Sequence, residues 1–169
     1  MVSFIYFGTA CGCPLFAWVS RLIGSVKQAI IIGGIGMIVL LAYLVFIPNI
    51  PIWTANTILF SIGICTGAEI LCFIAACAIM SPEVAGTMTG FLNGVVSLAA
   101  AMIQQHVGIV LDYFWEGEMT AAGIRSYSIH TYKVAFGVIL IFTCISVILA
   151  FFIKPQRKFQ ESQTEASPA

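Results

Sequence analysis

A few polar side chains interrupt the long apolar stretches of this chain, and they are the groups that could do chemistry. Each would be costly to leave in lipid, so each must face a protein interior or a water-filled cavity. Carboxyl, amide and imidazole groups in such places bind polar solutes or exchange protons. The candidate substrate or proton pathway consists of Glu69, Asn93, Ser97, Gln104, Gln105 and His106.

Glu69 is the strongest candidate for a functional role among these residues. No Lys or Arg occurs inside the apolar stretches, so an ionised Glu69 needs water, a ligand or a cation from another polypeptide. A carboxyl group that water or solute reaches can take up and release a proton, as coupling requires. The structural alternative is a protonated Glu69 bonded to a carbonyl. An interhelical hydrogen bond explains Asn93 and Ser97 equally well, and hydration near the outer interface explains His106.

The composition predicts the elements that must position these groups. Of 169 residues, 60% are hydrophobic and 8% are charged, whereas a soluble domain carries about 25% charge. The chain is therefore expected to be an all-α integral membrane protein in a lipid bilayer, with one domain over 1–153 and a disordered cytoplasmic tail over 154–169. The apolar stretches predict five transmembrane helices, over about residues 2–19, 29–47, 54–80, 86–111 and 134–153.

Several classes of function are excluded. Seven Lys and Arg balance seven Asp and Glu, so no basic face for nucleic acid is expected. All six cysteines lie inside apolar stretches, where a thiol behaves as a small hydrophobe, and Cys11-Gly12-Cys13 has the wrong spacing for a metal pair. No Ser/His, paired-Asp or His-Glu-x-x-His arrangement occurs. We therefore expect no metal, no cofactor and no enzymatic activity.

The basic residues predict an orientation. Two of them, Arg125 and Lys133, lie on one side of the five-helix arrangement, and five lie on the other. Because positive charge favours the cytoplasm, Met1 is expected outside and the C-terminus inside. The loop over 112–133 then lies outside, with its aromatic rings at the headgroups, and 81–85 lies inside. The five cytoplasmic basic residues are Arg21, Lys27, Lys154, Arg157 and Lys158.

Glycines at four-residue spacing predict close helix packing, because a missing side chain lets a neighbouring backbone approach. One pair, Gly63 and Gly67, lies in the third stretch, and Gly86, Gly90 and Gly94 form a longer repeat in the fourth.

Two parts of the chain resemble the major facilitator superfamily. Residues 17–27 form a short basic loop with a glycine at its bend, similar to the loop between that family's eighth and ninth helices. Residues 67–93 and 105–112 are similar to its tenth and eleventh helices, with a Pro-Glu turn, a Gly-x-x-x-Gly-x-x-Asn pattern and a Gly-x-x-x-Asp pattern. The resemblance implies cytoplasmic gating loops that contain Arg21, Gly24, Lys27, Pro82 and Glu83.

The resemblance also implies a fold and a function. The fold would be the C-terminal half-bundle of a major facilitator, helices eight to twelve, lacking its first helix. The chain would be part of a secondary active transporter in a bacterial inner membrane. It would move a metabolite or amino acid by alternating access, in proton symport, together with the missing N-terminal half. The alternative is a non-transporting membrane scaffold or assembly subunit that docks through its glycine stripes.

Overall fold

The chain forms a bundle of apolar helices. The computed structural model describes residues 2–47, 50–119, 123 and 125–153, and the expected tail over 154–169 lies outside them. Within these ranges the chain is helical apart from short connections and one isolated β-bridge between Met119 and Arg125. Five of its segments are long and apolar enough to cross a membrane. The expected all-helical, five-span architecture is confirmed to that extent.

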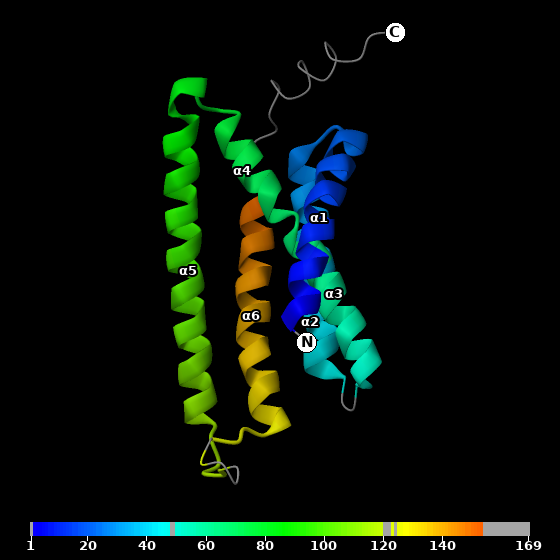
Figure 1. Cartoon of the computed structure of the whole chain (residues 1–169), viewed down its shortest axis with the longest axis vertical. Coiled ribbons are helices and arrows are strands. Elements are labelled where there is room, and N and C mark those ends of the chain that lie inside the picture. Colours follow the sequence, from blue (N-terminus) through cyan, green and yellow to red (C-terminus); the bar gives the residue numbers. More distant parts are fainter. Residues whose placement is uncertain (1, 48–49, 120–122, 124, 154–169) are drawn as a thin grey trace.

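The spans lie roughly side by side (Figure 1). The helices α1, α2 and α3 group together, α6 lies beside them, and α5 stands at the far edge, while α4 leans across from α3 towards the start of α5. In chain order they are α1 (Val2–Ile23), α2 (Val26–Phe46), α3 (Ile52–Thr66), α4 (Glu69–Cys77), the 3-10 turn η1 (Pro82–Val84), α5 (Ala85–Tyr113) and α6 (Ile129–Ala150).

Two helices begin earlier than hydropathy predicts, because serine caps set their first turns. Helix α2 begins at Val26, since the Ser25 hydroxyl accepts a hydrogen bond from the N–H of Gln28 at 3.4 Å. Helix α6 begins at Ile129, since Ser128 accepts from the N–H of Thr131 at 3.3 Å. An N-cap satisfies a free backbone donor whatever the polarity of the turn that follows. Each helix therefore includes a polar first turn that hydropathy alone leaves out. The expected starts at 29 and 134 were too late for this reason.

The third span is not the single helix expected over 54–80. It breaks after Thr66 into α3 and α4, and α4 ends at Cys77. At the break the N–H of Gly67 bonds the carbonyl of Ile64 at 3.0 Å, a tighter pattern than in an α-helix. A Cβ on Gly67 would lie 2.3 Å from the backbone of Gly12, so the break falls at a point of very close helix approach.

That close approach belongs to a parallel pair, α1 and α3. Gly8 and Gly12 on α1 face Gly63 and Gly67 on α3, in the same order along both helices. A Cβ on Gly8 or on Gly63 would lie 2.2 Å from a backbone oxygen of the other helix. The two backbones therefore touch without side chains between them, which makes this a strongly shape-dependent contact.

Helix α2 is joined to α6 by a lysine hydrogen bond near each of its ends. At one end Lys27 Nζ donates to the carbonyl of Phe151 at 2.6 Å, and at the other Lys133 Nζ donates to the carbonyl of Ile47 at 3.2 Å. Phe151 is the C-cap of α6, where a cation also meets the negative end of the helix dipole. Both amines are thus occupied at the ends of the spans.

Candidate functional site

Helix α5 carries the candidate site because its faces differ in chemistry. Successive residues of a helix turn by about 100°, so residues three, four or seven apart share a face. One face is partly buried, where α5 contacts α4 and α6. A second face exposes large apolar side chains, namely Phe91, Val95, Leu98, Met102 and Ile109. The third is small and polar, and we call it the polar face of α5: Gly86, Gly90, Asn93, Ser97, Gln104 and Gly108.

The polar face has no neighbour in the described chain. Helix α5 spans 29 residues without one buried residue, and positions 93–102 are all exposed. A Cβ added to Gly86, Gly90 or Gly94 would meet nothing within 4 Å. The helix packing expected of this repeat is therefore not made within the described residues, in contrast to Gly63 and Gly67. Contact of the repeat with another polypeptide stays a prediction.

The polar side chains of this face also lack hydrogen-bond partners. Asn93, Ser97 and Gln104 make no side-chain hydrogen bond to any described residue. Many hydroxyls elsewhere in the spans behave differently, since each donates to a carbonyl about one turn earlier in its own helix, which removes the cost of placing it in lipid. These hydroxyls belong to Thr57, Ser61, Thr66, Thr89, Thr143 and Ser146.

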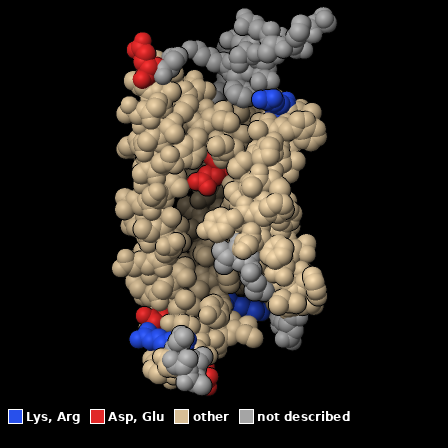
Figure 2. Space-filling model, in the orientation of Figure 1, with Lys and Arg blue, Asp and Glu red and all other residues tan. Residues whose placement is uncertain are grey.

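Glu69 opens α4 and points away from the packed side of that helix. Its side chain is exposed and forms no hydrogen bond or ion pair with the described residues, while Leu71 beside it is fully buried. Of the described acidic residues, only Glu69 lies within a span away from its ends. In Figure 2 the surface is hollowed between α5 and the helices opposite, and acidic atoms lie at the edge of this hollow.

Glu69 and the polar face lie at the same depth. Helices α4 and α5 meet where Cys77 Sγ lies 3.4 Å from Thr89 Oγ1, and from there they run apart in opposite chain directions. Glu69 precedes Cys77 by eight residues and Ser97 follows Thr89 by eight. At a rise of 1.5 Å per residue, both lie about 12 Å from that contact. Glu69, Asn93 and Ser97 therefore lie at similar depths in the bundle, with Gln104 two turns further along α5, and we treat them together as the candidate site.

Gln105 and His106 do not belong to this assembly. They lie about 100° and 200° around α5 from Gln104, so they point away from the polar face. Both are exposed, and His106 Nδ1 lies 2.7 Å from the carbonyl of Met102, to which it donates. The sequence placed them beside Gln104, but helical rotation separates them.

The expected gating residues gather at one end of the bundle without forming an ion pair. Arg21 lies in the last turn of α1, Gly24 follows with a left-handed φ of 68°, and Lys27 is held by the end of α6. Pro82 and Glu83 lie in η1 at the same end (Figure 1). Arg21 and Glu83 are exposed, and neither is paired with a described residue.

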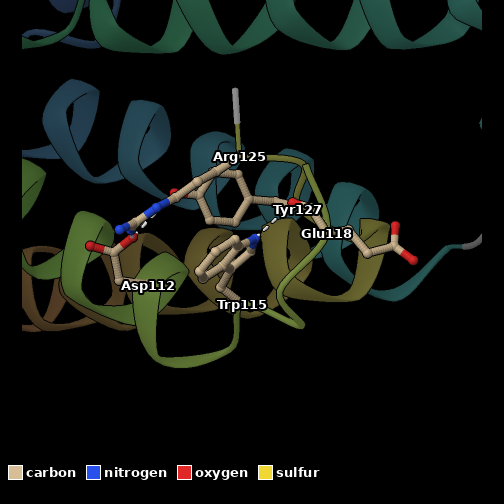
Figure 3. A network of polar contacts seen from close by, with 5 residues as sticks. All are labelled: Asp112, Trp115, Glu118, Arg125 and Tyr127. Atoms are coloured by element: carbon tan, nitrogen blue, oxygen red, sulfur yellow. Dashed lines mark hydrogen bonds and ion pairs between the residues drawn. The ribbon is translucent and has the colours of Figure 1, made fainter. Parts of the chain in front are cut away.

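A polar network closes the opposite end, and the sequence did not predict it (Figure 3). Arg125 donates to the carboxylate of Asp112 and lies 4.7 Å from the centre of the Trp115 ring, while the Tyr127 hydroxyl donates to Asp112 at 3.2 Å. Hydrogen bonding to Tyr127 and then to Asp112 raises the pKa of Arg125 above its usual value. Trp115 Nε1 bonds the carbonyl of Glu118 at 3.0 Å, which completes the turn. The network folds the connection after α5 back onto that helix.

The described residues bring no three potential metal ligands together, and the six cysteines are free thiols. Sequence reasoning also passed over Gly8 and Gly12, although their four-residue spacing is the same signal that identified Gly63 and Gly67. Comparison of the chain with protein-family models, with curated proteins and with solved structures found no match.

Proposed function

We propose that this chain is part of a secondary active transporter that moves a small polar solute across a membrane by alternating access. The observation that carries the proposal is the set of polar side chains at similar depths, Glu69, Asn93 and Ser97, none of which forms a hydrogen bond or ion pair with a described residue. Ionisable and polar groups inside spans mark solute and ion paths, because leaving them in lipid is costly.

The resemblance to major facilitator helices eight to twelve supports the same proposal. Transporters of that family place their solute site near the bilayer midplane, between two halves of the protein. The polar face of α5 is open, and the opposing half would stand there. We therefore propose an N-terminal transporter half as the partner, and a bacterial inner membrane as the location.

The groups of the site have separate roles in this proposal. Asn93 and Ser97 offer hydrogen bonds to the solute, and Glu69 is the group that can couple transport to a proton. Arg21 and Glu83 lie at the end where the gating loops are proposed. This chain and the other half would together determine which metabolite or amino acid is transported.

Water access to the polar face tests the proposal. In a variant without native cysteines, Ser97→Cys should react with a water-soluble maleimide when the chain is in lipid nanodiscs, because the polar side chains of this face hold water beside them even before the opposing half is bound. Leu98→Cys is the matched control, since it lies at the same depth on the lipid-exposed face, about 100° away. It should react at least tenfold more slowly, since the thiolate that reacts does not form in lipid.

Equal protection of Ser97→Cys and Leu98→Cys in the chain alone would contradict an aqueous path. The alternative function, a non-transporting scaffold or assembly subunit, is favoured by the unoccupied space beside Gly86, Gly90 and Gly94. A scaffold would lose labelling at position 97 permanently once its partner is bound. A transporter would keep it in one of its two conformations.

The proposed orientation has its own test. Cysteine-reactive, membrane-impermeant reagents should reach Ser126→Cys from outside and Ser162→Cys from the cytoplasm, because the basic residues favour a cytoplasmic C-terminus. Labelling of both positions from the same side would contradict five spans.

A further inference from the structure

We infer that the solute is a cation, and that the Glu69 carboxylate binds its positively charged group. This inference rests on the proposed transport function, which it deepens by naming the charge class of the solute.

No basic side chain of the described residues is free to approach Glu69. Lys27 and Lys133 are bound to backbone carbonyls at the ends of α2 and α6, and Arg125 is held by Asp112 beyond the end of α5. Arg21 lies in the last turn of α1. An anionic solute in the hollow would therefore meet a carboxylate and no opposing cation, whereas a cationic solute would meet its counter-ion.

Glu69 lies inside the span because the helix breaks there. It is the first residue of α4, and the break at Gly67 and Ala68 places this helix start within the span instead of at its end. Its side chain is exposed on the side of α4 away from the buried Leu71, so a solute can reach the carboxyl group.

The remaining polar groups are neutral and do not select charge. Asn93, Ser97 and Gln104 each offer both hydrogen-bond donors and acceptors, so they suit the uncharged parts of many solutes. Discrimination by charge then falls to Glu69, which lies at the depth of Ser97. The site therefore suits an amine or quaternary ammonium group with polar substituents.

Charged thiol reagents test the inference with probes of defined charge in place of the solute. In the full chain with Ser97→Cys and no other cysteine, reaction rates are measured with a trimethylammonium and a sulfonate methanethiosulfonate. Each rate is divided by that of the same reagent with 2-mercaptoethanol. The normalised rate should be at least about tenfold higher for the cation, because Glu69 attracts one reagent and repels the other.

Glu69→Gln keeps the shape of the side chain and removes its charge, so the ratio should fall to about one. Glu118→Gln is the matched control, because it removes the same charge outside the spans and should leave the ratio unchanged. Benzyltrimethylammonium should also slow labelling of position 97 by neutral N-ethylmaleimide, in a way that depends on Glu69, whereas benzenesulfonate should not.

The outcomes separate the two proposals. If no reagent reaches position 97, the aqueous path is refuted and the cation site with it. If reagents reach position 97 but the ratio is close to one, is unchanged by Glu69→Gln, or the cation gives no protection, the transport path stands and the cation site is refuted.

Discussion

An alanine at Gly12 should force α1 and α3 apart. The added Cβ would lie 2.3 Å from the carbonyl oxygen of Ile64 and 2.8 Å from its Cα. Relaxed contacts between carbon atoms are about 3.5–4.0 Å, and two helix backbones cannot yield locally, so the interface must open by roughly 1 Å. Overpacking of this kind costs about 1–3 kcal/mol.

Gly90→Ala provides the reference. A Cβ at Gly90 would meet nothing within 4 Å, so the substitution adds no steric cost. Both positions lie inside helices, where alanine is favoured over glycine by about 1 kcal/mol. Because that gain is common to both variants, the difference between their free energies of unfolding is the steric cost alone, about 1–3 kcal/mol.

The two free energies are measured by titrating the chain in mixed micelles with sodium dodecyl sulfate, with helix content followed by circular dichroism. Gly12→Ala should unfold at lower denaturant than Gly90→Ala. Equal stability of the two variants would refute the backbone contact between α1 and α3. A less stable Gly90→Ala would show that the polar face of α5 is packed in the isolated chain.

Two further predictions concern the ends of the bundle. Asp112→Asn should speed cleavage by trypsin after Arg125, because the guanidinium loses its charged partner. An arginine is cationic at both pH 7 and pH 9, and the hydrogen bond to Tyr127 raises the pKa of Arg125 further, so the ratio of the cleavage rates of the two proteins should be the same at both pH values. Lys27→Met should lower the free energy of unfolding by about 1 kcal/mol, because the bond to Phe151 is lost and with it the charge at the end of α6; an unchanged denaturation midpoint would contradict it.

The spans could be predicted because hydropathy is a property of each segment by itself. Each expected stretch corresponds to one span. The expected helix starts were wrong where one polar residue, Ser25 or Ser128, caps a helix earlier than hydropathy predicts. The break at Gly67 could not be predicted in this way. It lies against Gly12, more than fifty residues away in the sequence, so its cause is visible only in the packed bundle.

The candidate site could be predicted only in part for the same reason. Glu69 and Asn93 stand out because their side chains are costly in lipid, whatever surrounds them. The spacing of Gly63 and Gly67 is identical to that of Gly86 and Gly90, yet one pair touches a backbone and the other touches nothing. A four-residue spacing of glycines predicts only that another helix could approach closely. Whether one does depends on the element that lies beside those glycines.

The attachment of α2 to α6 has a consequence for biosynthesis. Lys27 bonds a carbonyl 124 residues further along the chain, whereas Thr9 bonds the hydroxyl of Thr66 at a separation of 57. At about 5–20 residues per second, Thr66 is made roughly 3–11 s after Thr9, but Lys27 waits roughly 6–25 s for Phe151. A nascent chain therefore holds one completed helix pair and one helix without its main neighbour. Loss of α6 would leave α2 in that state permanently and make it a recognisable target for quality control.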